Sequence, residues 1–229
     1  MITVKGLQKK YGEKVALQLE VLEINAGEHV GVVGNNGAGK TTLFSLILDL
    51  IRATTGEVHS KGISVAGSDH WKTYTGSFLD ESFLIDYLSP EEYFEFVAKL
   101  YQWDKDRLYT FLDSFKAFFN EEILGRKTFI RNLSKGNQKK VGLVAALIGD
   151  PEFLLLDEPF ANLDPTSQFR LKQLLSEIRQ DKTVLISSHD LNHVTDVCER
   201  IILLEGGLLV KDIETNEATL KELESYFAV

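Results

Sequence analysis

Cysteine and long apolar runs are both scarce in this sequence, and each shortage excludes a class of protein. The single cysteine among 229 residues, Cys198, excludes an intrachain disulfide and favours a reducing compartment. Cys198 lies in "HVTDVCERI", which we expect to be helical, and its expected role is that of a small buried apolar residue. The longest apolar stretch, "VGLVAALIG", is far shorter than the ~18 residues that a membrane-spanning helix needs. A membrane-spanning chain is therefore not predicted.

Signals that target a chain or separate its domains are also missing. The segment "MITVKGLQKKYG" lacks the apolar region of a signal peptide. We find no repeat, low-complexity segment or Pro/Gly-rich linker. The formal net charge of −9 disfavours a broad nucleic-acid-binding surface. We therefore expect a soluble, intracellular protein with no nucleic-acid partner.

The apolar pattern predicts an α/β fold. Alternating apolar residues up to about residue 34 indicate strands, and strand and helix alternate after residue 150, which favours a parallel sheet with crossover helices. The segment between them has a helical period, with Ser89 as N-cap and Pro90 in the first turn. We predict one domain over residues 1–229. Residues 1–88 and 150–229 form a mostly parallel core with an N-terminal antiparallel β subdomain, and residues 89–149 form a helical insertion.

The run "GNNGAGKTT" predicts a phosphate-binding loop. It matches G-x-x-x-x-G-K-[ST], in which glycines let several backbone N–H groups converge on one anion. Lys40 is expected to reach the β- and γ-phosphates, and Thr41 to offer a hydroxyl to Mg²⁺. An apolar strand precedes the loop and an apolar helix follows it. The residues predicted to bind the nucleotide phosphates are Gly34, Asn35, Asn36, Gly37, Ala38, Gly39, Lys40, Thr41 and Thr42.

Two adjacent carboxylates follow an apolar run in "LLLDEPFANLD". Carboxylates are rarely buried without compensation, so either a cation binds there or the strand opens onto a cleft. In P-loop NTPases an Asp at the end of a neighbouring strand holds Mg²⁺, and Asp157 occupies that position. Glu158 lies where a base would polarise the water that attacks the γ-phosphate. Asp157 and Thr41 are the predicted metal ligands.

Taken together, the motifs resemble those of the ATP-binding cassette ATPases, the nucleotide-binding subunits of ABC transporters. The resemblance covers nearly the whole chain and rests on five segments in the family's order: "KKYGEKVAL", "GNNGAGKTTL", "NLSKGNQKKVGLVAAL", "FLLLDEPFANLDP" and "LISSH". It implies a P-loop NTPase core, ATP hydrolysis, and ATP and Mg²⁺ as the bound groups.

The resemblance also implies further site residues. Tyr11 matches the aromatic residue that stacks on adenine, and His189 matches the switch histidine that contacts the γ-phosphate. Glu158, His189 and Lys40 would then be the catalytic residues. Residues 162–164 resemble the loop that crosses to a partner subunit. The family signature, which faces a phosphate held by a different subunit, corresponds to Ser134, Lys135, Gly136 and Asn137. The remaining histidines, expected to be surface or structural residues, are His29, His59, His70 and His193.

The family resemblance implies partners as well as chemistry. A second cassette, expected to be an identical copy, would complete each catalytic site, and a multi-span permease would receive the work of hydrolysis. The chain would then be cytoplasmic and bound to the membrane's cytoplasmic face through that permease. The short chain, "LSKG" and "EEYFEFVAKLY" look most like subunits of exporters.

Two departures from the family pattern leave questions open. Lys135 and Asn137 replace the usual Gly and Gln of the signature. Asp80 aligns with a glutamine that normally links Mg²⁺ and water to the membrane subunit. Its carboxylate is a candidate metal ligand, but it would also repel the γ-phosphate and slow turnover. The nearby aromatic residues, which are either a docking face or core, are Phe83, Tyr87, Tyr93, Phe94 and Phe96, with core favoured after Pro90.

Two other functions fit the same motifs. One is a regulatory ATPase of the same fold without a transport partner, although such relatives usually fuse two cassettes or insert long coiled coils. The other is a subunit that binds ATP and hydrolyses it weakly, which Asp80 would favour and an intact Glu158 and His189 would oppose.

Overall fold

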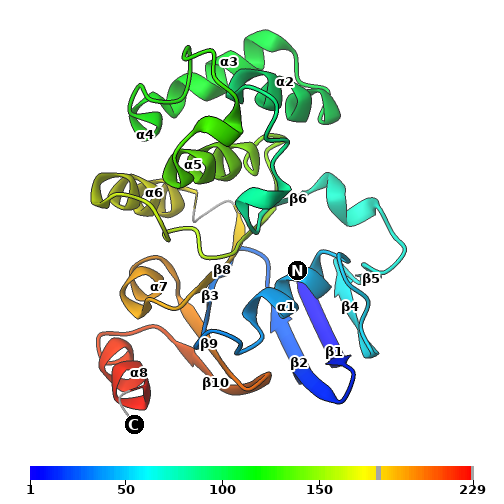
Figure 1. Ribbon diagram of the computed structural model, residues 1–229. Coiled ribbons are helices and arrows are strands. Elements are labelled where there is room, and N and C mark those ends of the chain that lie inside the picture. The colour runs from blue at the N-terminus through cyan, green and yellow to red at the C-terminus, as the bar shows by residue number, and fades with distance from the viewer. Residues whose placement is uncertain (179–181, 228–229) are drawn as a thin grey trace.

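A computed structural model describes residues 1–178 and 182–227, and these residues build one ten-stranded sheet with helices on its faces (Figure 1). The strand order is β5-β4-β1-β2-β10-β9-β3-β8-β7-β6. The strands are β1 (Ile2–Tyr11), β2 (Lys14–Ile24), β3 (His29–Val33), β4 (Thr55–Ser60), β5 (Ile63–Ser64), β6 (Thr75–Phe78), β7 (Phe153–Leu156), β8 (Thr183–Ser188), β9 (Arg200–Glu205) and β10 (Leu208–Glu214).

The sheet is parallel at its centre and antiparallel at its N-terminal end. Strand β3 lies between β8 and β9 and pairs in parallel with both, and β8, β7 and β6 continue the parallel part. Strand β1 pairs antiparallel with β2 and β4, with Val4 opposite both Leu22 and Val58. Every residue of β3, β7 and β8 is buried, as expected for parallel strands covered on both faces. The predicted α/β class with an antiparallel β end is confirmed.

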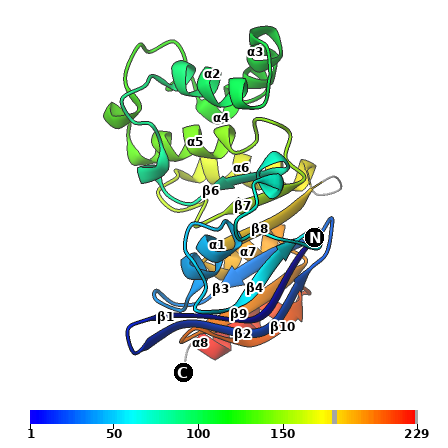
Figure 2. The same cartoon turned by 90° about the vertical axis from the view of Figure 1, so that its right-hand side faces the viewer.

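The helices divide between the sheet and a group at one end of the molecule. Figure 2 shows α2, α3, α4 and α5 together at the end opposite strands β1 and β2. The helices are α1 (Lys40–Ile47), α2 (Pro90–Leu100), α3 (Lys105–Ser114), α4 (Lys116–Phe119), α5 (Lys135–Ala145), α6 (Pro165–Glu177), α7 (Leu191–Val197) and α8 (Thr219–Phe227), with short 3-10 turns η1 (His70–Thr73), η2 (Glu81–Phe83) and η3 (Ile130–Asn132).

Two apolar clusters hold these parts together. One joins the N-terminal strands to α1, where Leu43 and Phe44 are fully buried. The other packs the helical group against β7 and β8, and in it the rings of Phe94 and Phe119 are 5.9 Å apart. Helix α1 and the loop before it are therefore held against the sheet, while α5 packs against β6, where Gly142 meets the ring of Phe78.

Short-range sequence patterns predicted most of the helices and strands, and the structure differs from the prediction at three places. Ser89 caps α2 through a capping box with Glu92, as its sequence position predicts. The helical run "DKDRLYTFLDSFKAFF" is broken at Phe115 into α3 and α4. Cys198 is buried, but it is extended and directly follows α7, so its expected helical placement was wrong. Strand β6, which periodicity did not reveal, pairs with β7.

In the two described stretches, every helix is too short or too polar to cross a membrane.

Replacing Phe94 by Ala is expected to lower the free energy of unfolding by ~3–5 kcal/mol, because its fully buried ring would leave a cavity between α2 and α4. Phe96 lies on the same helix with 44% of its surface exposed, so Phe96→Ala should cost only about 0.5 kcal/mol. Urea denaturation followed by circular dichroism measures both. Equal losses would show that the side chain of Phe94 is not part of the core.

Candidate active site

A glycine-rich loop joins the buried strand β3 to α1. A Cβ on Gly34 (φ 153°) would lie 2.3 Å from the carbonyl oxygen of Leu204, and one on Gly39 (φ 108°) 2.9 Å from that of Ala16. Since both neighbours are backbone atoms, only glycine permits this close approach to β9 and β2. Gly39 is also the N-cap residue of α1 and has no side chain that could accept from the first-turn N–H groups. Those donors are available to an anion.

The first two residues of α1 bring a cation and a hydroxyl to this loop. Lys40 is 6% exposed, and its Nζ donates to the carbonyl oxygen of Gly34 at 2.7 Å. The same Nζ lies 3.6 Å from Oε1 of Glu158. Thr41 Oγ1 donates to Oδ2 of Asp157 at 2.7 Å. The loop, the lysine and the two carboxylates therefore form one cluster.

Asp157 directly follows β7 and is held from two other elements. Besides the Thr41 hydrogen bond, the hydroxyl of Ser187 in β8 donates to Oδ1 of Asp157. Burial raises the pKa of Asp157 above its usual value, and the charge of Glu158 adds to this, against the hydrogen bonds and Lys40. A cation would compensate this buried carboxylate. The adjacent hydroxyl and carboxylate oxygens are the hard donors that Mg²⁺ prefers, so these residues fit that ion.

Glu158 is fixed through its backbone as well as its side chain. Its φ is 47°, in the left-handed region, and its N–H donates to Ser187 Oγ at 2.9 Å. Its carbonyl accepts from Nζ of Lys139 at 2.8 Å. Its Oε2 lies 2.8 Å from Nδ1 of His189, which follows β8 and is mostly exposed. The parallel order of β7 and β8 thus places the carboxylate and the imidazole at the same sheet edge.

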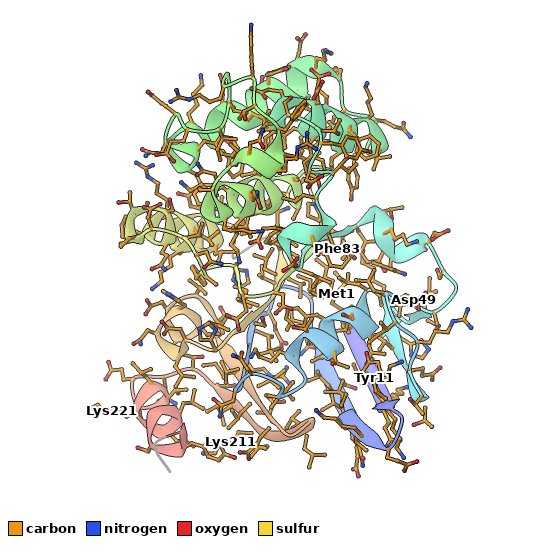
Figure 3. All side chains as sticks on the ribbon, viewed as in Figure 1. Met1, Tyr11, Asp49, Phe83, Lys211 and Lys221 are labelled. Atoms are coloured by element: carbon orange, nitrogen blue, oxygen red, sulfur yellow. The ribbon has the colours of Figure 1, made fainter. Side chains whose placement is uncertain are left out.

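A hollow of about 330 Å³, called the phosphate-loop hollow below, unites most of the predicted nucleotide contacts. Tyr11, at the end of β1, is 55% exposed, and Nζ of Lys9 lies 4.9 Å from its ring centroid. The tyrosine is well away from the helical group (Figure 3). The lining residues are Tyr11, Lys14, Ala16, Asn36, Gly37, Ala38, Gly39, Lys40, Thr41, Thr42 and Glu158. An exposed aromatic ring at one end and a glycine loop at the other suit a base and a phosphate chain.

The signature residues lie at the N-terminus of α5. Ser134 is the N-cap and accepts from the N–H of Asn137 at 3.2 Å. The amide of Asn137 donates to Glu122 at 3.1 Å, and Lys135 is exposed. A Cβ on Gly136 would lie 2.7 Å from the carbonyl oxygen of Asn162, so the signature and the 162–164 loop touch within one chain. The signature residues are absent from the described lining of the phosphate-loop hollow.

Asp80 is the N-cap of η2. Its Oδ1 accepts from the N–H of Ser82 at 2.7 Å. Hydrogen bonding from Ser82 lowers the pKa of Asp80 below its usual value, and the charges of Lys135 and Lys139 lower it further. Asp80 lines a second hollow, of about 380 Å³, together with Thr41, Asp157 and Glu158. It is therefore near the predicted metal ligands, with one oxygen already used by its own turn.

The aromatic residues after Asp80 divide between surface and interior. Phe83 and Tyr87 are 61% and 63% exposed, whereas Phe94 is fully buried and Tyr93 half-buried. Phe96 is exposed, so the preference for core after Pro90 was wrong at that position. Phe83 lies between the helical group and the N-terminal strands (Figure 3). It borders the β6 groove, a cavity of about 350 Å³ whose apolar lining includes Leu50, Trp71, Phe78, Phe83, Leu84, Tyr93, Val97 and Tyr101.

Sequence reasoning missed two residues that contact the cluster of the loop, Lys40, Asp157 and Glu158. Ser187 belongs to the quoted "LISSH" segment, but its bonds to Asp157 and Glu158 depend on the pairing of β7 with β8. Lys139 gave a weak signal, because lysine is unusual on the buried face of a helix and needs a partner there. Of the other histidines, His29 is buried in β3 and His193 stacks on Phe160 with centroids 4.6 Å apart, in agreement with structural roles.

The fold and this cluster of side chains define the class of protein to which the chain belongs. A glycine loop joins a buried parallel strand to a helix, and Thr41 of that helix donates to Asp157 at the end of β7, another strand in the parallel part of the same sheet. This is the arrangement of a P-loop NTPase. Residues 19–161 match the protein family described as ABC transporter. The chain therefore belongs to the ATP-binding proteins of ABC transporters, a family of ATP-binding cassette ATPases.

Several relatives support this membership. The chain is 34% identical over 197 residues to an uncharacterized ABC transporter ATP-binding protein, all4389, of Nostoc, a match that covers 82% of the chain and 57% of that relative's length. It is 32% identical over 228 residues to YhaQ of Bacillus subtilis, covering 99% of the chain and 74% of YhaQ. LptB, the ATP-binding protein of a lipopolysaccharide export system of Haemophilus influenzae, is 28% identical over 219 residues, with 92% and 89% covered.

A solved structure agrees over most of the chain. The dimeric ATP-binding cassette MJ0796, in a post-hydrolysis state with ADP and phosphate, superposes with a TM-score of 0.83 at 27% identity. The match covers 94% of this chain and 99% of MJ0796. The predicted fold is thereby confirmed as that of ABC cassettes.

Replacing Gly34 by Ala is expected to destabilise the protein more than replacing Gly37 by Ala. Both residues have positive φ, but only at Gly34 does a new Cβ meet backbone, 2.3 Å from the Leu204 oxygen. The added overlap should cost ~1–3 kcal/mol beyond the strain shared by both variants. Urea midpoints of the two variants provide the comparison. If they coincide, the loop relaxes freely away from β9.

Proposed function

We propose that this chain binds and hydrolyses ATP, dimerises on ATP, and uses that cycle to power a separate transmembrane permease, in the direction of export. The observation that carries the proposal is the convergence of Lys40, Thr41, Asp157, Glu158 and His189 beside the glycine loop. Each is a residue type that phosphoryl transfer to water requires.

The roles follow from the contacts of each residue. The loop amides and Lys40 bind the phosphate chain, and Tyr11 stacks on the base at the other end of the hollow. Thr41 and Asp157 would hold Mg²⁺, which neutralises phosphate charge when bound. Glu158 orients the attacking water and accepts its proton as the bond from the γ-phosphorus to ADP breaks. His189, within hydrogen-bond distance of Glu158, is placed to donate to the γ-phosphate.

Dimerisation is part of the proposal because the signature residues lie outside their own chain's phosphate-loop hollow. The N-terminus of α5, capped by Ser134, would face the γ-phosphate held by a second copy. The loop at Asn162, which touches Gly136, would lie in the same interface. The dimeric state of MJ0796 supports this arrangement.

The permease partner is proposed from the β6 groove. Phe83 is exposed at its rim and also lines the hollow of Asp157 and Glu158, and Tyr87, four residues further along the chain, is exposed as well. This apolar surface would suit a helix of a multi-span protein. The name of LptB, part of an export system, favours export. With such a partner the chain would sit on the cytoplasmic face of the membrane. A non-transport regulatory ATPase would share the site without needing this surface.

Asp80 favours a second candidate function, that of a subunit which binds ATP but hydrolyses it slowly. Its carboxylate lines one hollow with Asp157 and Glu158, where it adds negative charge opposite the γ-phosphate. Lys135 and Lys139 offset part of that charge. Measured turnover separates the two candidates.

Substituting Glu158 by Gln should reduce ATP hydrolysis by about 10²–10⁴-fold, because the base is lost while the shape remains. Binding of a fluorescent ATP analogue should persist, and ATP should drive the variant into a dimer detectable by light scattering. Glu152→Gln, which removes an exposed carboxylate paired with Lys61, provides the control and should hydrolyse ATP normally. If wild type and Glu158→Gln turn over equally slowly, the weak-hydrolysis candidate holds instead.

Removing the two exposed rings beside the groove should release the chain from membranes. The double substitution Phe83→Ser and Tyr87→Ser is expected to reduce co-purification with a multi-span protein at least about tenfold, since apolar rings anchor such interfaces. Phe169→Ser is the matched control, because Phe169 is equally exposed but lies on α6. ATP hydrolysis by the purified variants should stay normal. Full retention of the membrane partner would contradict the docking role.

A further inference from the structure

A buried lysine on the signature helix reaches the backbone of the proposed base. The side chain of Lys139 is 6% exposed, and its Nζ donates to the carbonyl oxygen of Glu158 at 2.8 Å. Oε1 of Glu81 lies 3.6 Å from the same Nζ, and the ring centroid of Phe78 5.7 Å away. An ammonium group is costly to bury, so it must be held by partners. Here those partners belong to the loop after β7, which carries Glu158, and to η2, which carries Glu81.

The contact matters because Glu158 adopts a backbone conformation that few non-glycine residues occupy. At a φ of 47° the residue needs support from its surroundings. Ser187 accepts from its N–H and Lys139 donates to its carbonyl, so the peptide groups on both sides of the residue are held. With the backbone held there, Oε2 lies 2.8 Å from Nδ1 of His189.

Glu81 holds the other side of the ammonium. Its side chain is 11% exposed. Within the described part of the chain its buried Oε1 has no hydrogen-bond partner, and the 3.6 Å ion pair with Lys139 is its charged contact. Asp80 feels the charge of Lys139, which lowers its pKa, but its Oδ1 accepts from Ser82, and among the described residues the ion pair of Lys139 is formed with Glu81. The turn η2 continues to Phe83 at the rim of the β6 groove. Lys139 therefore links the signature helix, the turn beside the groove and the loop after β7.

We propose that Lys139 is a positioning residue for ATP hydrolysis, which holds the Glu158 carbonyl so that the carboxylate stays beside His189, and that Glu81 holds the lysine in place. The inference rests on the proposed role of Glu158 as the base. Lys139 lines the hollow that contains Asp80 and Asp157 but not the described part of the phosphate-loop hollow, so in this proposal it acts through Glu158. Its loss should therefore slow turnover and leave ATP affinity intact.

The chain offers a matched control in Lys182. Its side chain is 13% exposed, and its Nζ donates to the carbonyl oxygen of Pro151 at 2.9 Å and to Asp150 at 2.5 Å. The chemistry is the same as at Lys139, a largely buried ammonium between a main-chain carbonyl and a carboxylate. Lys182 precedes β8, whereas Glu158 and His189 follow the other ends of β7 and β8. The substitution Lys182→Met therefore removes a similar contact far from Glu158 and His189.

The experiment compares steady-state kinetics of the full chain with Lys139→Met, Lys139→Arg, Glu81→Gln and Lys182→Met. Lys139→Met should lower kcat by about 10–100-fold with KM for ATP within about twofold, since misplacing a catalytic group affects the chemical step. Lys139→Arg keeps a donor and should recover at least about threefold of the lost kcat. Lys182→Met should keep kcat and KM at wild-type values. Glu81→Gln should lower kcat about threefold, with no further loss when added to Lys139→Met.

The proposal is overturned if Lys139→Met keeps the wild-type kcat, or if Lys182→Met loses as much. If Lys139→Met does not fold, judged by its melting curve, the decision passes to Glu81→Gln and Lys139→Arg, and wild-type kcat in Glu81→Gln then overturns the proposal. Glu158→Gln, assayed alongside, distinguishes the two failures. Wild-type turnover by Glu158→Gln would refute the proposed role of Glu158 as the base. If Glu158→Gln loses turnover while Lys139→Met keeps the wild-type kcat, only the positioning role of Lys139 is refuted.

Discussion

The compensation of one buried carboxylate, Asp157, is the constraint on which the rest of this site depends. Asp157 directly follows β7, a strand made only of apolar residues, and burial raises the pKa of its carboxyl group. Two hydroxyls, from Thr41 on α1 and Ser187 on β8, donate to it. These bonds tie the start of the phosphate-loop helix to two neighbouring strands. They also leave the carboxylate of Asp157 next to the hydroxyl of Thr41, and both are oxygen donors of the kind that a hard cation prefers.

A second level of organisation surrounds the adjacent Glu158. Its side chain contacts Lys40 and His189, while its backbone is held by Ser187 and Lys139. The side-chain contacts come from elements that carry the nucleotide chemistry. The Lys139 contact comes instead from α5, whose first turn bears the signature. The helical group therefore contacts the backbone of Glu158 through the same helix that begins with the signature residues.

The charge pattern near Asp80 shows how the chain accommodates an acidic residue at this position. Asp80 caps its own turn through Ser82, and Glu81 pairs with Lys139. Two carboxylates beside a phosphate site would repel the substrate if both faced it. One is directed to a backbone N–H and the other to a buried ammonium, which reduces that repulsion. The exposed Phe83 on the same turn then connects this arrangement with the β6 groove.

Motifs with a local mechanism were readable directly from the sequence. The glycine loop followed by Lys40, the apolar run that ends in Asp157, and the Ser89 cap of α2 each depend on residues within one short segment. Their geometry follows from backbone sterics, burial and hydrogen bonding between near neighbours. The alternation of strand and helix after residue 150 likewise predicted the parallel sheet. These features predicted the class of the protein, which is confirmed, and most of the residues that line the phosphate-loop hollow.

Contacts between distant segments were decided only by the tertiary structure. The single register pair of Leu208 with Gln18 that joins the two parts of the sheet has no local signature. The same is true of Ser187, whose contacts follow from the pairing of β7 with β8, and of Lys139 on α5, whose partner Glu158 lies 19 residues away in the loop after β7. Periodicity reports which face of an element is buried but not what packs against it. The partners of a buried polar group are therefore chosen by packing, which the sequence alone does not display.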